Sequence, residues 1–193
     1  MFISPINLCF LYLLITYYAV CFKRNYRFIC WFETNSIALH LNTMEGNKII
    51  NTVTNLFRGA DDRDWPLIES ILAPVVTLDY SSMNGFGPAE LSPAQIVDNW
   101  ASFLPGFDKT DHRVSAFKVQ LNGKMADVFY STVASHFLGD QVWVVTANYH
   151  TKLAKYDDTW LITYHKIDFE SQSGNANLPK QAHQVIADRK AVQ

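Results

Sequence analysis

The first part of the polar and apolar pattern is helical. Between residues 45 and 60, apolar side chains recur every three or four positions, which predicts a helix with one apolar stripe and one polar face. Asp64 suits the N-cap of a second helix, which tolerates Pro66 in its first turn. We expect Pro74 to end that helix. Both helices have an apolar face that can cover a sheet.

The next part alternates between strand and helix signals. Residues 75–80 are rich in β-branched and aromatic side chains and predict a strand that ends at Tyr80. Residues 81–90 contain Gly and Pro and predict a loop. Ser92 and the proline after it predict the start of a third helix, which runs to Leu104.

The rest of the chain reads mostly as strand. Turn signals separate four long segments, which predicts an antiparallel meander. Helices followed by strands favour an α+β fold, a curved antiparallel or mixed sheet with the N-terminal helices over its concave face. Such a sheet leaves a conical cavity beneath the helices. The four predicted strands are Asp111–Leu121, Lys124–Phe137, Gln141–Tyr156 and Thr159–Phe169.

The composition divides the chain into three segments. Residues 1–43 form an apolar extension with all three cysteines, residues 44–170 the main domain, and residues 171–193 a polar tail that ends in a helix from Pro179. Residues 2–22 are uncharged and about as long as a membrane-spanning helix. Two readings of the extension stay open: a membrane anchor that keeps the domain on the cytoplasmic side, and a misassigned start with Met44 as the first residue. Either reading predicts a cytoplasmic domain.

Charge and motif content exclude several classes of function. The formal net charge is −2 and the basic residues form no cluster after residue 43, so we expect no nucleic-acid partner. The histidines lack the spacing of metal ligands, and no glycine-rich phosphate loop is present. These features predict neither a metal nor an organic cofactor.

Strand register decides whether His112 and His136 share one face. A two-residue turn at Asn122-Gly123 would pair His112 with Val133, which points to the face opposite His136. The apolar phase of this strand, however, shifts between Val114 and Phe117, and an inserted bulge residue near 115–117 would produce that shift. With the bulge, both histidines point inward.

Two short motifs resemble a known family. DxxDW at residues 61–65 and APVVTLDYSS at residues 73–82, together with the two histidines, resemble the SnoaL-like domains of the nuclear transport factor 2-like superfamily, and within it the scytalone dehydratases. The resemblance covers about residues 49–169 and implies an α+β cone. It also implies a catalytic set made of Asp61, Tyr80, His112 and His136.

The resemblance further implies acid–base chemistry. The two histidines would exchange protons with a small cyclic or polyketide-like carbonyl compound, while Asp61 orients one imidazole and Tyr80 holds the carbonyl oxygen. This predicts a lyase or isomerase, of the dehydratase type, that needs no cofactor. The expected substrate pocket consists of Val114, Phe117, Val119, Val128, Tyr130 and Asn148.

Two other functions stay open. The domain could bind a small ligand without turnover, or it could serve as a dimerising accessory domain. Both are slightly favoured by Ala60, which stands where the scytalone dehydratases have a second tyrosine. The resemblance implies a homo-oligomer, either a dimer or a trimer.

Overall fold

A computed structural model describes the backbone of residues 27–191 and the side chains from residue 42 onward. The expected membrane anchor at residues 2–22 lies outside the described residues. Within the described part of the chain, no helix is both long and apolar enough to cross a bilayer. The chain divides into two compact units, Met1–Met44 and Glu45–Gln193. The second unit contains the sheet and its covering helices.

Helices precede and follow the strands, and β1 and β2 lie among the early helices. The elements are α2 (Arg27–Asp62), α3 (Trp65–Ser70), β1 (Leu72–Asp79), α4 (Ser81–Asn84), β2 (Ala89–Leu91), α5 (Pro93–Ala101), the 3-10 turn η1 (Leu104–Gly106), β3 (Lys109–Asn122), β4 (Met125–Leu138), β5 (Gln141–Tyr156), β6 (Thr159–Gly174) and α6 (Leu178–Ala191).

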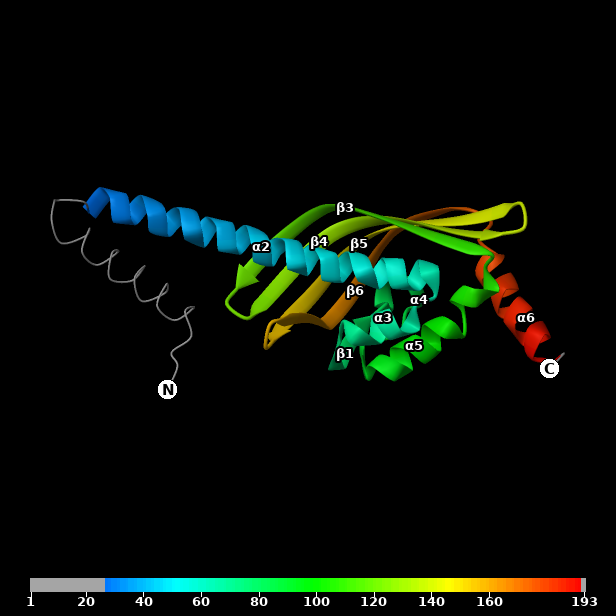
Figure 1. The fold of residues 1–193 in the computed structure, drawn as a ribbon. Helices are drawn as coiled ribbons and strands as arrows, with labels where there is room; N and C mark the ends of the chain where they lie inside the picture. Colours follow the sequence, from blue (N-terminus) through cyan, green and yellow to red (C-terminus); the bar gives the residue numbers. More distant parts are fainter. Residues whose placement is uncertain (1–26, 192–193) are drawn as a thin grey trace, which may run out of the picture. The chain divides into compact units, whose positions relative to one another are not determined.

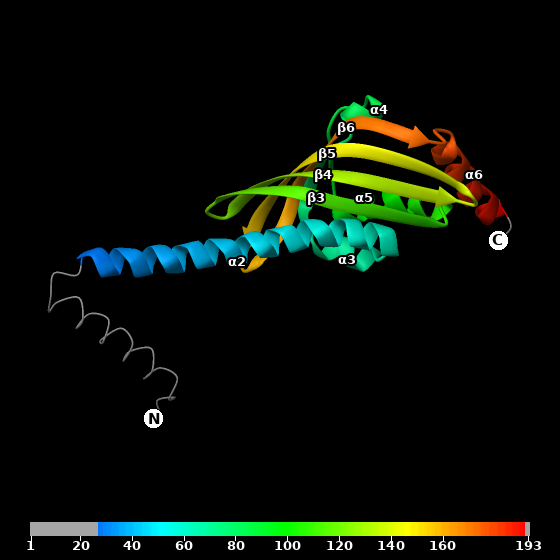
Figure 2. The ribbon, with the colours of Figure 1, turned by 90° about the horizontal axis from the view of Figure 1, so that it is seen from above.

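The six strands form one mixed sheet in the order β2-β1-β6-β5-β4-β3. The four long strands, β3 to β6, pair antiparallel in chain order, so the predicted meander is confirmed (Figure 2). β1 pairs parallel with β6, and the short β2 closes the edge beside β1. The predicted α+β architecture is therefore also confirmed.

One face of the sheet packs against helices and the other is exposed. In β4 the burial alternates strictly, with every second side chain from Ala126 to His136 buried. α3, α5 and the second half of α2 lie on the same side of the sheet (Figure 1). Ile49, Val53 and Leu56, which α2 presents at helical spacing, are fully or almost fully buried. The core therefore lies between these helices and the inner face of the sheet.

Several boundaries differ from the predictions, including the end of α5 at Ala101 rather than at Leu104. Pro74 does not end a helix, because α3 already ends at Ser70 and Pro74 lies within β1. There it interrupts no ladder, since the regular pairing of β1 with β6 breaks between Leu72 and Thr77. β2 falls inside the predicted loop. α2 begins at Arg27, upstream of the predicted start at residue 45, in a stretch that contains neither Gly nor Pro.

The bulge in β3 is confirmed. The register with β4 shifts between Ser115 and Lys118, and Ala116 takes a left-handed φ of 57°. The predicted turn is wrong by one residue, because Asn122 pairs with Met125 and Gly123-Lys124 form the turn. This error displaces the pairing partner of each residue by two positions, which keeps the same side chains on the same face.

The C-terminal segment is more ordered than a polar tail. β6 continues to Gly174, and α6 packs through Leu178 and Ala182, both fully buried. These apolar residues lie one helical turn apart, so they seat the helix on η1. A Cβ on Gly106 would lie 2.2 Å from the Ala182 carbonyl oxygen, so glycine permits this close approach. Residues 171–174 thus belong to β6, and the predicted C-terminal helix is confirmed as α6, which begins at Leu178.

Candidate functional site

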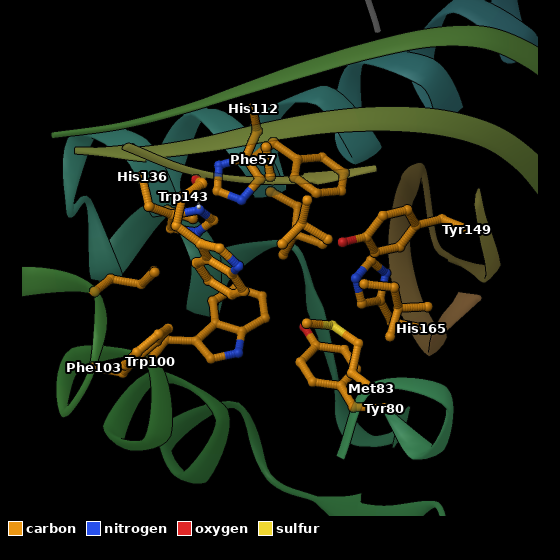
Figure 3. A pocket seen from close by; sticks show the side chains of 16 residues that line it. Phe57, Tyr80, Met83, Trp100, Phe103, His112, His136, Trp143, Tyr149 and His165 are labelled. Carbon is orange, nitrogen blue, oxygen red and sulfur yellow. Dashed lines mark hydrogen bonds between the residues drawn. The ribbon is translucent and has the colours of Figure 1, made fainter. Parts of the chain in front are cut away.

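A cavity of about 140 Å³ lies between the inner face of the sheet and the helices (Figure 3). Leu56, Ala60, Leu104, Ala134, Val145 and Ile167 give it a mostly apolar wall. The polar atoms belong to a few aromatic rings, a composition typical of small-molecule sites. These rings are His112, His136, His165, Tyr80, Tyr149, Trp100 and Trp143.

Asp61 and His112 form the tightest polar contact of the site. Asp61 lies in the last turn of α2, and its Oδ1 is 2.6 Å from His112 Nδ1. Its Oδ2 accepts the backbone N–H of His112 at 2.8 Å. Burial opposes the charge on Asp61, but the hydrogen bonds that it accepts from His112 outweigh burial and lower the pKa of Asp61 below its ordinary value. With Nδ1 engaged, only Nε2 of His112 is left for a ligand.

Arg63 fixes the end of α2 and with it the position of Asp61. Arg63 has a left-handed φ of 60°, and Asp64 N donates to Gly59 O at 2.8 Å, which is the 6→1 bond of a Schellman motif. The Arg63 guanidinium donates to the carbonyls of Ala60 and Asp61 at 2.6 and 2.8 Å. It also donates to Thr110 Oγ1 at 2.8 Å and to the Leu104 carbonyl at 2.9 Å, which tie the helix end to β3 and η1.

His136 lies beside His112 on the neighbouring strand. The ring centroids are 5.6 Å apart and the rings are nearly perpendicular at 81°. His136 Nδ1 lies 3.4 Å from the Trp143 carbonyl, so Nδ1 carries the proton and donates it. Burial lowers the pKa of His136 to about 4, because the charged form of the ring would lose its solvation and would be repelled by a protonated His112. The ring is therefore neutral near pH 7.

Two phenols reach the cavity from the other side. Tyr80 follows the end of β1 directly and is the N-terminal boundary residue of α4. Tyr149 comes from the inner face of β5, and its hydroxyl points into the cavity (Figure 3). Burial raises the pKa of both phenols, so each keeps its proton and can donate a hydrogen bond.

A third histidine, His165 of β6, also lines the cavity. Its Nδ1 lies 3.0 Å from Thr151 Oγ1, which in turn lies 2.8 Å from the Tyr130 hydroxyl. His165 is 2% exposed, and burial lowers its pKa to about 3. Sequence reasoning missed His165 and Tyr149 as site residues. The sequence signal for Tyr149 was the alternation of β5, in which Ala147, Tyr149 and Thr151 share the inward phase. His165 lies on the same face because it pairs with Thr151 across the two strands.

The sequence of residues 45–166, most of the second unit, matches the SnoaL-like domain family. The chain belongs to this family.

Solved structures show the same nuclear transport factor 2-like cone fold as this SnoaL-like domain. They include the Kfla4162 protein of Kribbella flavida, with 22% identity and a TM-score of 0.68 over 72% of this chain and 99% of that one. A protein described as a putative scytalone dehydratase from Novosphingobium aromaticivorans has 16% identity and a TM-score of 0.59 over 69% and 89%. The hexachlorocyclohexane dehydrochlorinase LinA-type3 of Novosphingobium barchaimii has 14% identity and a TM-score of 0.57 over 70% and 92%. No curated protein sequence matches the chain.

The SnoaL-like domain brings the four expected catalytic residues together. Tyr80, His112 and His136 line the cavity, and Asp61 lies directly behind His112. The expected pocket residues are placed differently. Five of them lie on the inner face of the sheet but do not line the cavity. They pack in the core beneath α2 instead: Val114, Phe117, Val119, Val128 and Tyr130.

Asn148 is a clearer correction to the expected pocket. It lies on the outer face of β5, is exposed, and bonds to Ser131 and Glu170. The reason is the strand period, because Asn148 stands between the inward residues Ala147 and Tyr149.

The outer face carries a second carboxylate–imidazole pair. Asp127 Oδ1 lies 2.6 Å from His150 Nε2, and the His150 ring stacks on Phe129 at 4.3 Å. This pair matches Asp61 and His112 in distance, but neither of its residues lines the cavity. It therefore provides a matched internal control for the inner pair.

Proposed function

We propose that this SnoaL-like domain is a cofactor-independent lyase that eliminates water or a hydrogen halide from a single-ring carbonyl compound. The observation that carries the proposal is the contact between Asp61 and His112, in which a half-buried carboxylate fixes the imidazole at Nδ1 and leaves Nε2 beside an apolar cavity. A base oriented in this way needs no metal to abstract a proton next to a carbonyl.

His112 performs the central proton transfer. Its Nε2 takes a proton from the carbon α to the carbonyl, and the electron pair of that C–H bond forms the C=C bond as the C–O or C–halogen bond breaks. Asp61 stabilises the imidazolium that results. When the leaving group is hydroxide, the imidazolium returns the proton and water departs; a halide departs as the anion, and the proton passes to solvent.

His136 and Tyr80 assist at the two ends of the substrate. Because His136 is neutral and donates through Nδ1, its Nε2 can accept a hydrogen bond from the substrate hydroxyl. Tyr80, held protonated by burial, can donate to the carbonyl oxygen as negative charge develops there. The two groups therefore orient the substrate and stabilise the enolate, respectively.

The size of the cavity limits the substrate. A cavity of about 140 Å³ is close to the roughly 150 Å³ that holds a benzene molecule in an apolar protein interior. This favours one six-membered ring over a fused polyketide. The described activities of similar structures, a hexachlorocyclohexane dehydrochlorinase and a putative dehydratase, are eliminations and support the same reaction class.

The test uses 3-hydroxycyclohexanone and 3-chlorocyclohexanone, which both give cyclohexenone, a conjugated product with a strong ultraviolet absorbance. We expect turnover by the protein and a loss of about 10²- to 10⁴-fold in kcat/KM for His112→Ala. His150→Ala, which removes the imidazole of the matched pair on the outer face, should keep full activity.

Two outcomes would overturn the proposal. Turnover that survives His112→Ala would place the chemistry elsewhere. Binding of either ring without any turnover would assign the domain to non-catalytic ligand binding, the second function left open by the sequence.

A further inference from the structure

A buried chain of hydrogen bonds leads from the core to the cavity. It runs from the Tyr130 hydroxyl to Thr151 Oγ1, 2.8 Å away, and from there to His165 Nδ1, 3.0 Å away. Tyr130 is 3% exposed, Thr151 0% and His165 2%, so solvent contributes little to this chain. The residues come from β4, β5 and β6, and their positions are fixed by the pairing of those strands.

The direction of the protons in this chain follows from its partners. Among the described residues, the Tyr130 hydroxyl has Thr151 Oγ1 as its hydrogen-bond partner, so the phenol must donate to it to avoid a buried unsatisfied proton. Thr151 then has its own proton to donate, and His165 Nδ1 accepts it. A neutral imidazole with a bare Nδ1 carries its proton on Nε2. This series of hydrogen bonds, from Tyr130 through Thr151 to His165, is called the relay below. The relay fixes the tautomer of His165.

The proton on Nε2 faces the cavity. In the described part of the chain, the one fully enclosed side-chain N or O atom without a hydrogen-bond partner is Thr132 Oγ1. His165 Nε2 and the Tyr149 hydroxyl also make no hydrogen bond to described residues, but they are not fully enclosed. Because both residues line the cavity, each of these atoms is in contact with cavity space. Their rings lie 5.2 Å apart. Two donors without acceptors thus converge on one side of an apolar chamber.

These donors lie apart from the proton-transfer pair. Figure 3 shows Tyr149, His165 and Tyr80 on one side of the cavity and His112 with His136 on the other. The Phe57 ring lies between them, 5.4 Å from the His112 ring and 6.1 Å from the His165 ring. Because residues of both sides line one cavity of about 140 Å³, a ligand that fills this cavity contacts both sides.

We propose that His165 Nε2–H and the Tyr149 hydroxyl form a donor site that binds an oxygen acceptor of the ligand, a ketone or enolate oxygen, and so selects oxygenated rings over plain hydrocarbon rings. This inference rests on the proposed function for the identity of the ligand. It adds a specificity determinant beside Tyr80, built on β5 and β6, in which Thr151 and Tyr130 are positioning residues.

Binding of two probes of similar size tests the donor site without any need for turnover. Cyclohexanone offers an oxygen acceptor and methylcyclohexane does not. We expect Tyr149→Phe, which removes one hydroxyl, to raise the Kd of cyclohexanone about three- to tenfold and to leave that of methylcyclohexane unchanged. Tyr164→Phe removes a phenol that bonds to Asp79, outside the cavity lining, and should change neither Kd.

The relay has its own readout. The ¹⁵N shifts of the His165 ring should show the proton on Nε2 in the unsubstituted protein and in Thr151→Ser, which keeps the hydroxyl. In Thr151→Val, which is similar in shape but lacks the hydroxyl, we expect a mixture of tautomers and weaker cyclohexanone binding.

Three results would overturn the inference: a proton on Nδ1 of His165 in the unsubstituted protein, equal effects of Tyr149→Phe on both probes, or no measurable binding of cyclohexanone. Failure of the proposed lyase activity is a separate result. That activity is tested by comparing turnover in the unsubstituted protein and in His112→Ala, whereas the donor site is tested by the Kd values of the two probes, which require no turnover.

Discussion

His112 pairs with Ala134 rather than with Ser135, and this places its ring on the same face as that of His136, 5.6 Å away. The cause is the one-residue bulge at Ala116, because without it the register set by the turn would turn His112 outward. The relationship between the two histidines thus depends on a single backbone irregularity.

The bulge should be sensitive to the residue at position 116. Ala116 has a φ of 57°, a region that β-branched residues strongly avoid and glycine enters freely. We expect Ala116→Val to lower the free energy of unfolding by about 1–2 kcal/mol and Ala116→Gly to be close to neutral. Urea denaturation measures both. Gln120→Val, at an exposed and regularly paired position of β3, is the control and should cost little; equal losses at positions 116 and 120 would contradict the argument.

Removing the charge of Asp61 should impair proton transfer while preserving the fold. Asp61→Asn keeps the shape of the side chain but presents an amide to His112 Nδ1, so the imidazole loses its fixed tautomer and the stabilisation of its cation. We expect kcat/KM for the elimination of 3-hydroxycyclohexanone to fall by about 10²-fold or more. Asp127→Asn alters the matched outer pair and should leave turnover unchanged. A similar loss in both variants would indicate a structural effect.

The side chain of Arg63 should stabilise the fold, whereas its left-handed backbone conformation should lower the free energy of unfolding. Arg63→Ala removes four hydrogen bonds and keeps the strained φ of 60°, so we expect a loss of about 2–4 kcal/mol in the free energy of unfolding. Arg63→Gly loses the same bonds but relieves the strain, and should be about 1 kcal/mol more stable than Arg63→Ala. Arg58→Ala, exposed on α2, is the control. Equal stabilities of the alanine and glycine variants at position 63 would rule out the backbone contribution.

Two buried histidines should make the folded state sensitive to acid. Burial lowers the pKa of His136 to about 4 and that of His165 to about 3, below the ordinary value of 6.5. Between these values the unfolded chain binds protons that the folded chain does not, so the stabilisation is complete above about pH 6.5 and is lost as the pH falls toward the folded values. We expect the free energy of unfolding at pH 5 to be about 2 kcal/mol lower per histidine than at pH 7.5.

His165→Gln tests this pH dependence, because the difference between the two pH values cancels other effects of the substitution. The decrease from pH 7.5 to pH 5 in urea denaturation should become about 2 kcal/mol smaller than in the unsubstituted protein. An unchanged decrease would show that His165 is protonated equally in the folded and unfolded states.

The local pattern was enough to predict the meander, the first helix and the inward phase of β3. The phase shift between Val114 and Phe117 even located the bulge, because side-chain alternation has a period of two and one extra residue reverses it. Pro74 was misjudged, because a proline's effect depends on whether its position needs a ladder hydrogen bond, and only the strand pairing shows that.

The sequence by itself thus determined the α+β order of elements, the family and the faces on which the two expected histidines lie, since these follow from periodicity and short motifs. Only the tertiary structure decided where along the inner face the cavity lies, because that depends on how the helices pack against the sheet. It also decided that Tyr149 and His165 belong to the cavity. The place of His165 there depends on its pairing with Thr151 across two strands, which no local pattern in either strand specifies.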